Sequence, residues 1–437
     1  MFYLLFLVFF LNKAYSGYLN LGYKPKSADL TAEFFLEPVK GISFSEACQA
    51  VASESSIGTW TDIATMSPAI RKKLSPKVFE ANKKTGIIKI AYSPELFEKG
   101  NIPQLMSSIA GNIFGMKEVQ NLRLEDINFP DAYIKSFRGP AFGIKGIRKI
   151  LKVPKRPLLG TIVKPKLGLN AKQHAEVAFQ AWIGGCDIVK DDENLSSMSF
   201  NKFEKRVKHT LRLRDKAEKI TGERKAYVAN VTAPYKEMVR RAKFLKKAGN
   251  EYAMVDVVTT GWSALQELRN ENLGLILHAH RAGHAAFTRN PKHGISMLAI
   301  AKLCRLCGTD QLHVGAIFGK MTGPKKEVKA IREEIEHKIV RPNAKQHVLG
   351  ENWLNIKPMF AVCSGGLHPG KVPGLVNAMG NDIIIQMGGG IHGHPKGTIK
   401  GAMAARQSLE SALQGISLKD AAEKNSELRI ALKKWKE

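Results

Sequence analysis

Acidic residues are scarce in this 437-residue chain relative to basic ones. It has 39 Asp and Glu against 67 Lys and Arg, which gives a formal net charge of +28. A positive field of this size favours an anionic partner, either a nucleic acid, an anionic surface or a phosphorylated small molecule. The sequence has no zinc-finger spacing, no RNA-recognition signature and no stripe of alternating aromatic and basic residues. We therefore expect no specific nucleic-acid partner and take solvated surface lysine as the default interpretation.

Cysteine is sparse as well. The one C-x-x-C pair has no second pair to complete a zinc site, and five scattered thiols do not make a disulfide scaffold. Buried, reduced thiols of a cytoplasmic enzyme are the preferred interpretation. The five are Cys48, Cys186, Cys304, Cys307 and Cys363.

Long apolar runs are missing after the first residues. Met1–Leu11 is apolar throughout but too short to span a bilayer, and no positive charge precedes it as in a secretory signal. We treat residues 1–20 as an apolar N-terminal extension of uncertain status. No later segment approaches 18 uninterrupted apolar residues, so we expect no membrane partner.

What is present predicts two domains. Residues 21–135 mix strand patterns at Leu30–Leu36 and Gly86–Tyr92 with helical spacing at Phe44–Ala52 and Ile102–Ile113, which predicts a small α+β domain. Residues 136–157, with their Pro and Gly, are interpreted as a connector.

From residue 158 to 437, short apolar runs alternate with amphipathic stretches of helical length. Such alternation predicts right-handed βαβ units and a parallel sheet, and eight units favour a closed (β/α)8 TIM barrel over an open doubly wound sheet. The eight candidate strands are Leu158–Val163, Cys186–Val189, Ala226–Val231, Ala253–Val258, Leu273–Leu277, Leu312–Phe318, Ile356–Val362 and Ile383–Met387.

Polar residues of catalytic types follow the first two strands. Lys164 and Lys166 come after the first, where a lysine crowded by other cations can serve as a base. Lys190, Asp192 and Glu193 come after the second, and two carboxylates suit a hard cation such as Mg2+. A lysine beside a metal makes sense if it pairs with a carboxylate or becomes an anionic ligand by carbamylation. Taken singly, each motif would be an ordinary charged loop.

The later strands end in imidazoles, lysine and glycine. His278, His280 and Arg281 end the fifth, and for the two histidines a role in the core is about as probable as acid/base chemistry. The sixth carries His313 and leads to Lys320 in a glycine-hinged loop that could close over substrate. The last two end in Ser364-Gly365-Gly366 and Gly388-Gly389-Gly390, at the loops that habitually bind phosphate in barrels.

Together these tips indicate a phosphorylated substrate, a divalent metal and a proton-abstracting base. Proton removal beside a carbonyl, with metal stabilisation of the enediolate, is the chemistry they support. The spacing names neither the sugar nor the electrophile.

The motifs resemble those of the ribulose bisphosphate carboxylase/oxygenase large chain from about Tyr23 onward. They are GTIVKPKLGL at 160–169, GGCDIVKDDE at 184–193, HVGAIFGK at 313–320 and QMGGG at 386–390. Three others resemble the archaeal form III branch: FRGP at 137–140, HAAFTRNPKHG at 284–294 and GGLHPG at 365–370.

The resemblance implies a carboxylase that adds CO2 to ribulose 1,5-bisphosphate, with O2 as a competing substrate. Lys164 would abstract the C3 proton with Lys166 in support, and His280 would assist proton transfer. Lys190, carbamylated by an activator CO2, would bind Mg2+ with Asp192 and Glu193. Lys320 would close over the nascent carboxylate. Substrate would contact Arg281, His313, Ser364, Gly365, Gly366, Gln386, Gly388 and Gly389.

The small domain also resembles the family, through ESSIGTW at 54–60 and Gly111-Asn112. The likeness implies that Glu54, Thr59, Trp60 and Asn112 complete the site of a partner subunit, so that the minimal active unit is a homodimer or a multiple of dimers. It also implies a role in AMP or nucleotide salvage.

Three departures and two alternatives accompany this interpretation. Ile57 stands where the motif has Thr, Gly283 replaces a bulky residue, and Thr322 stands where many members have Glu, which leaves CO2/O2 selectivity open. The first alternative is a carboxylase-like enolase or isomerase acting on another phosphosugar. The second is a non-catalytic, basic nucleic-acid-binding protein.

Overall fold

The computed structural model describes residues 15–318 and 325–437. Contacts divide the chain into two compact units, each assembled from segments that are separate in sequence. The first comprises residues up to Arg138, Gly283–Leu306 and His337–Ile356. The second comprises Gly139–Ala282, Cys307–Glu336 and Lys357–Glu437. The continuous boundaries expected at residues 135 and 158 stay a prediction about domain organisation.

The first unit is built on a five-stranded mixed sheet in the order β10-β4-β1-β3-β2, in which only the β10–β4 pair is parallel. The predicted strands and helices of this region are confirmed, while β2 and β4 were not expected because polar residues interrupt their apolar pattern. The strands are β1 (Leu30–Pro38), β2 (Lys77–Asn82), β3 (Ile87–Tyr92), β4 (Val119–Asn128) and β10 (Gly294–Ile295). Helices are α2 (Phe44–Glu54), α3 (Pro68–Leu74), α4 (Ile102–Ile109), α5 (Asp131–Ile134), α11 (Ala285–Thr288) and α12 (Met297–Cys307).

The second unit contains a closed barrel of eight parallel strands, in the order β11-β14-β15-β5-β6-β7-β8-β9. All eight predicted strands are present, so the barrel is confirmed and the open sheet is excluded. They are β5 (Leu158–Ile162), β6 (Ile188–Lys190), β7 (Ala226–Asn230), β8 (Tyr252–Asp256), β9 (Ile276–His280), β11 (Gln311–His313), β14 (Phe360–Ser364) and β15 (Ile383–Gln386).

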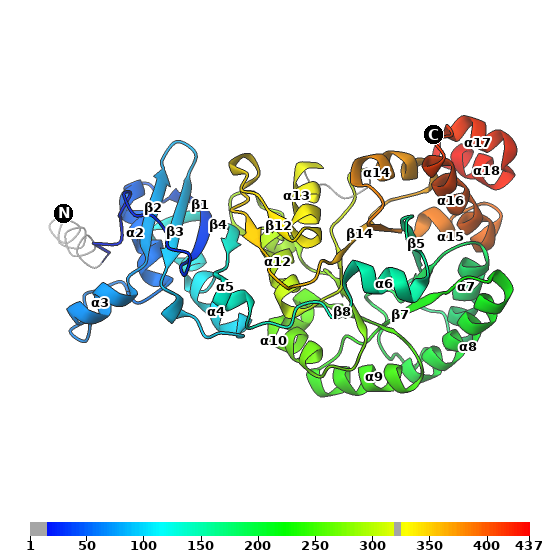
Figure 1. The fold of residues 1–437 in the computed structure, drawn as a ribbon, viewed down its shortest axis with the longest axis horizontal. Helices are drawn as coiled ribbons and strands as arrows, with labels where there is room; N and C mark the ends of the chain where they lie inside the picture. Colours follow the sequence, from blue (N-terminus) through cyan, green and yellow to red (C-terminus); the bar gives the residue numbers. More distant parts are fainter. Residues whose placement is uncertain (1–14, 319–324) are drawn as a thin grey trace. The chain divides into compact units, whose positions relative to one another are not determined.

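Helices surround this barrel (Figure 1). Those that follow successive strands are α7 (Ala171–Ile183), α8 (Phe203–Thr221), α9 (Tyr235–Lys247), α10 (Val257–Asn270), α13 (Lys325–Glu336), α14 (Val372–Met379), α15 (Gly389–His392) and α16 (Gly397–Leu413). The chain ends with α17 (Leu418–Lys424) and α18 (Ser426–Trp435).

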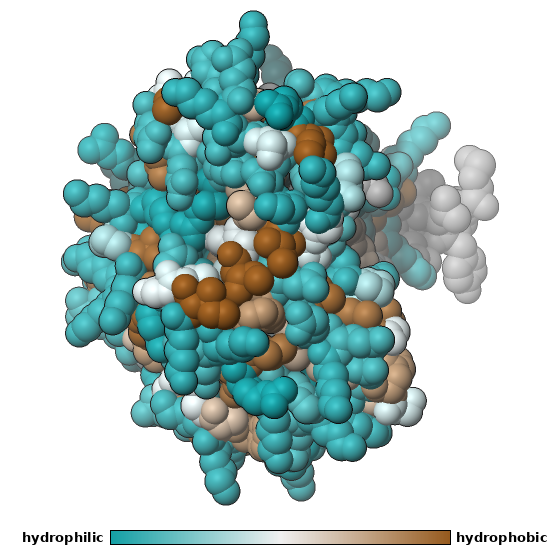
Figure 2. Space-filling view, turned by 90° about the vertical axis from the view of Figure 1, so that its right-hand side faces the viewer, coloured by the Kyte–Doolittle hydropathy of each residue, from teal (hydrophilic) through white to brown (hydrophobic). Residues whose placement is uncertain are grey.

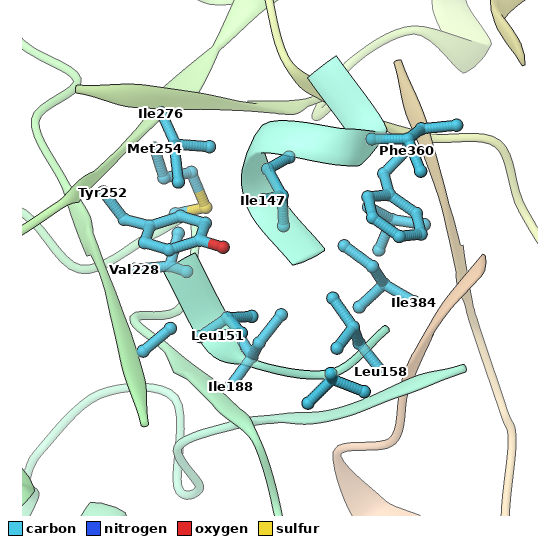
Figure 3. Packing of buried hydrophobic residues seen from close by; sticks show 14 residues of the cluster. Ile147, Leu151, Leu158, Ile188, Val228, Tyr252, Met254, Ile276, Phe360 and Ile384 are labelled. Carbon is cyan, nitrogen blue, oxygen red and sulfur yellow. The ribbon is translucent and has the colours of Figure 1, made fainter. Parts of the chain in front are cut away.

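Helix α6 (Gly143–Leu151) lies within the segment expected to be a connector. Its Ile144, Ile147 and Leu151 pack into one buried cluster with residues from the first positions of the strands, such as Leu158 and Ile188 (Figure 3). The helix therefore plugs the end of the barrel where the strands begin, because burying this apolar surface is favourable. The opposite end, where the strands finish, is left for polar side chains.

The surface and the thiols agree with the composition. The face drawn in Figure 2 is mainly hydrophilic, with a cluster of hydrophobic residues near its centre. All five cysteines are buried, and none of them forms a disulfide. Within the described ranges, no helix combines the length and the apolar character needed to cross a bilayer.

Candidate active site

The predicted site residues of the second unit gather where the barrel strands end. Because the strands are parallel and the barrel is closed, their carboxyl ends surround one mouth. Lys164 follows β5 by two residues. Five others are the last residues of their strands: Lys190 of β6, His280 of β9, His313 of β11, Ser364 of β14 and Gln386 of β15.

Lys164 and Asp192 form an ion pair across two neighbouring strand ends. The Lys164 Nζ lies 2.7 Å from Asp192 Oδ2, while the backbone and side-chain nitrogens of Asn194 donate to Asp192 Oδ1 at 3.1 and 3.0 Å. Burial of Asp192 raises the pKa of its carboxyl, but the hydrogen bonds from Lys164 and Asn194 outweigh this effect and lower it. The carboxylate is therefore held ionised, as a cation ligand must be.

Lys190 is fully buried beside acidic neighbours. Its Nζ donates to the Asp191 carbonyl oxygen at 2.7 Å and lies 3.5 Å from Glu193 Oε2. Burial lowers the pKa of Lys190, and the negative charges of Glu193 and Asp192 only partly oppose this. The neutral amine, which is the form that reacts with CO2, is therefore more accessible than in a solvated lysine.

His280 contacts Glu193, one of the predicted metal ligands, and Asp256 at the end of the neighbouring strand β8. Its Nδ1 lies 3.0 Å from Asp256 Oδ1, and its Nε2 lies 3.5 Å from Glu193 Oε2. Asp256 orients the ring as carboxylates commonly do for catalytic imidazoles. The sequence pattern did not single out Asp256, although its place at the last position of β8 is the same signal that identified the other residues at strand ends.

A second group of histidines lies deeper. His278 Nε2 is 2.9 Å from His313 Nε2, and His313 Nδ1 is 2.7 Å from the Ser364 hydroxyl. Both nitrogens of His313 are thus engaged, and a direct contact with phosphate would require one of these bonds to open. The inner nitrogen of His278 meets Gln311 Oε1 at 2.7 Å, a residue that the sequence interpretation did not select.

The glycines predicted to bind phosphate, and the neighbouring Gln386, have backbone and side-chain features that fit a binding loop. Gly365 and Gly366 have φ of 108° and 74°, which favour glycine. A Cβ on Gly388 would lie 3.1 Å from Lys164 Cε, so this loop contacts the lysine. The Gln386 amide is buried with neither polar atom hydrogen-bonded in the described structure, and such an unsatisfied group points to a missing partner.

The remaining predicted site residues are more exposed, belong to the first unit or lie outside the described residues. Arg281 is half-buried beside Gly315, and Lys166 is exposed. Lys320 and Thr322 lie outside the described residues. The four positions expected to serve a partner's site all belong to the first unit, where Trp60 and Asn112 are exposed. They are Glu54, Thr59, Trp60 and Asn112.

Asp191 has a structural role, unlike the adjacent Asp192 and Glu193. Its buried carboxylate accepts hydrogen bonds from Arg206 Nε (3.1 Å), Tyr227 Oη (2.7 Å) and the Asn230 backbone N–H (3.0 Å), and His174 Nε2 lies at 3.0 Å. Both carboxylate oxygens are thus engaged within the protein. Asp191 therefore positions the loop that carries Asp192 and Glu193 and is not available to a metal.

Replacing Asp191 with alanine is expected to lower the free energy of unfolding by about 3–5 kcal/mol, because Arg206 would stay buried without its counter-ion. Asp215→Ala, which removes a half-exposed partner of Arg214, should cost only about 0–1 kcal/mol. Burial raises the pKa of Asp191, but the opposing effect of Arg206 and His174 is larger, so the net pKa is lowered. The stability that this carboxylate contributes is therefore present above about pH 4 and is lost as the pH falls through the lowered pKa. Urea unfolding checks the order; equal losses would contradict it.

Two of the predicted carboxylates suit a hard cation. In the described ranges, no group of three or more His, Cys, Asp or Glu side chains is arranged to hold a metal ion. Asp192 and Glu193 could supply two oxygen ligands, and a carbamate on Lys190 could supply a third. The donor set fits Mg2+ if the lysine is modified.

Comparison with known proteins covers nearly the whole chain. The catalytic-domain profile of the ribulose bisphosphate carboxylase large chain matches residues 143–435, and its N-terminal-domain profile matches residues 17–133. The ribulose bisphosphate carboxylase of Methanosarcina mazei is 55% identical over 421 residues, covering 96% of this chain and 98% of that protein. That of Methanocaldococcus jannaschii is 52% identical, covering 96% and 100%.

Solved structures give the same answer. A dimeric archaeal Rubisco from Hyperthermus butylicus superposes with a TM-score of 0.91 at 46% identity, covering 97% of this chain and 99% of that one. An octameric Rubisco from Pyrococcus horikoshii has a TM-score of 0.88 at 45% identity, covering 96% of each chain. The resemblance of the motifs is confirmed, and this chain belongs to the archaeal branch of the ribulose bisphosphate carboxylase large-chain family.

Proposed function

We propose that this protein is a ribulose-1,5-bisphosphate carboxylase that adds CO2 to the enediolate of its substrate and cleaves the product. One bisphosphate, one CO2 and one water would give two molecules of 3-phosphoglycerate, with O2 addition as a side reaction. The observation that carries the proposal is the fully buried Lys190, 3.5 Å from Glu193 and two residues from Asp192. Both carboxylates lie within three residues of this buried amine, and a modified lysine would make the set a cation site.

Proton removal is assigned to Lys164. In the described state its ammonium is paired with Asp192 at 2.7 Å and cannot accept a proton. Mg2+ bound to Asp192, Glu193 and the Lys190 carbamate would polarise the substrate carbonyl as a Lewis acid. With Asp192 so engaged, Lys164 would lose its counter-ion, and its neutral amine could take the C3 proton. Lys166 and Lys320 would then neutralise charge on the substrate.

His280 would move protons at the substrate oxygens. Its Nδ1 is held between Asp256 Oδ1 at 3.0 Å and the Ala282 backbone N–H at 3.2 Å, which fixes the ring and leaves Nε2 as the nitrogen that could face substrate. Arg281 and the Gly365–Gly366 and Gly388–Gly389 backbones would bind the two phosphates, and Ser364 and Gln386 a sugar oxygen. The unsatisfied Gln386 amide supports that assignment.

A matched pair of glycine substitutions tests the phosphate loop. A Cβ on Gly389 would meet nothing within 4 Å, whereas one on Gly390 would lie 2.1 Å from the Leu367 carbonyl oxygen. Gly389→Ala should therefore fold normally but raise the KM for ribulose bisphosphate about tenfold, because the methyl group would stand where phosphate approaches. Gly390→Ala should instead lower the Tm. A normal KM in Gly389→Ala would contradict phosphate binding there.

The assembly and cellular setting are further parts of the proposal. We infer a homodimer or a multiple of dimers, supported by relatives whose structures are described as dimeric and octameric. Glu54, Thr59, Trp60 and Asn112 would complete the partner's site. A cytoplasmic location agrees with five free thiols, and a role in nucleotide salvage follows from the archaeal likeness.

Radiolabelled bicarbonate distinguishes this function from its alternatives. With Mg2+ and ribulose bisphosphate, the protein should form labelled 3-phosphoglycerate. Enolisation of another phosphosugar without label incorporation would favour an enolase or isomerase. Salt-sensitive RNA or DNA binding with no turnover would favour the nucleic-acid-binding alternative.

A further inference from the structure

Three hydrogen bonds in series connect the barrel interior to its mouth. They join Gln311 Oε1 to His278 Nδ1 (2.7 Å), His278 Nε2 to His313 Nε2 (2.9 Å), and His313 Nδ1 to Ser364 Oγ (2.7 Å). Gln311 and His278 are fully buried partners on β11 and β9, and His313 is only 3% exposed. Water therefore has little opportunity to replace any link.

Both imidazoles of the series are neutral near pH 7. Burial lowers the pKa of His278 to about 3, and burial together with the nearby His280 and His278 lowers the pKa of His313 well below its usual range. A neutral imidazole carries one N–H and one lone pair, so it donates at one nitrogen and accepts at the other. When two such rings are hydrogen-bonded in series, the donor or acceptor role at one end therefore fixes the roles of all the nitrogens up to the other end.

Gln311 fixes that direction at the inner end. Its carbonyl oxygen faces His278, while its amide nitrogen is 3.5 Å from the Tyr252 hydroxyl. A carbonyl can only accept, so His278 carries its proton on Nδ1 and accepts at Nε2 from His313. His313 then has only a lone pair at Nδ1, and the Ser364 hydroxyl must donate to it.

We propose that Gln311 is a positioning residue that makes Ser364 a hydrogen-bond acceptor toward substrate. Because the Ser364 hydroxyl donates its proton to His313, its oxygen can accept a hydrogen bond from a sugar hydroxyl. It has no second proton to donate to an anionic oxygen. The site thereby selects a hydroxyl group at this position, and His313 acts through Ser364. This inference rests on the proposed function only for the identity of the substrate.

Nitrogen-15 NMR of histidine in the substrate-free protein reads this direction, because protonated and unprotonated ring nitrogens have distinct shifts. We expect the proton on Nδ1 of His278 and on Nε2 of His313, with signals assigned from single His→Asn variants. The reverse pattern, Nε2–H on His278 and Nδ1–H on His313, would overturn the proposal. The measurement needs no substrate, so it stands or falls separately from the carboxylase assay.

Gln311→Met supplies the functional test, because it keeps the side-chain length and removes the acceptor. It should leave the two rings in mixed tautomers and lower kcat/KM for ribulose bisphosphate about tenfold. Ile276→Val, which removes one methylene from the same core, should alter neither. A Gln311→Met variant with lowered Tm but unchanged tautomers would show a merely structural role. If that variant fails to fold, the tautomers of the unmodified protein still decide.

Discussion

Lys190→Ala is expected to abolish activation by CO2 and Mg2+ and to lower carboxylation by at least about 10³-fold. Without the amine no carbamate can form, and Asp192 and Glu193 alone make a weak, incomplete cation site. The loss should appear both in turnover after preincubation with CO2 and Mg2+ and in retention of labelled CO2 by the protein. Activation that survives in this variant would defeat the carbamate assignment.

Lys225 offers a matched control for that experiment. It is also a fully buried lysine of the barrel, but it precedes β7 at the opposite end, where its Nζ donates to the Cys186 carbonyl oxygen and to Glu223. Lys225→Ala should lower stability while leaving CO2-dependent activation intact. If both variants lose activation equally, burial of a lysine, and not its chemistry, would be the common cause.

Lys164→Ala is expected to stop proton abstraction while leaving the cation site in place. Release of tritium to water from ribulose bisphosphate tritiated at C3 should fall about 10²- to 10⁴-fold, the usual contribution of a general base. CO2-dependent activation should persist, because Lys190 is untouched and Asp192 loses the competing ammonium 2.7 Å away.

The control for Lys164 is Lys172→Ala, which removes an exposed lysine from the first turn of α7. It should exchange tritium at the unmodified rate. Unimpaired tritium release from Lys164→Ala would assign the base to another residue.

The barrel and the placement of its polar tips were predictable from sequence because parallel strands have a simple signature. Each strand is a short apolar run buried on both faces, and the residue that ends it must reach the same mouth as the others. Lys190, His280 and Ser364 were identified in this way, and the structure brings their strands together in one barrel. The assignment of a specific sugar came only from the motif resemblance.

Other features depend on long-range packing that no local pattern reveals. Helix α6 lies in a stretch rich in Gly, and its role as a plug follows from which strand ends it covers. Asp191 and Asp192 are adjacent in sequence, yet Arg206 and Tyr227 commit the first to the interior. The proposed role of Gln311 could not be predicted from sequence, because it depends on contact with His278, its partner on the neighbouring strand. The grouping of Gly283–Leu306 with the first unit likewise depends on contacts remote in sequence.

The most direct test of the whole account is an experimental structure of the protein incubated with bicarbonate and Mg2+. We expect added density on the Lys190 Nζ and one cation bound by that group together with Asp192 and Glu193, with the Lys164–Asp192 ion pair broken. An unmodified Lys190, with Lys164 still on Asp192 and the cation bound elsewhere, would contradict it.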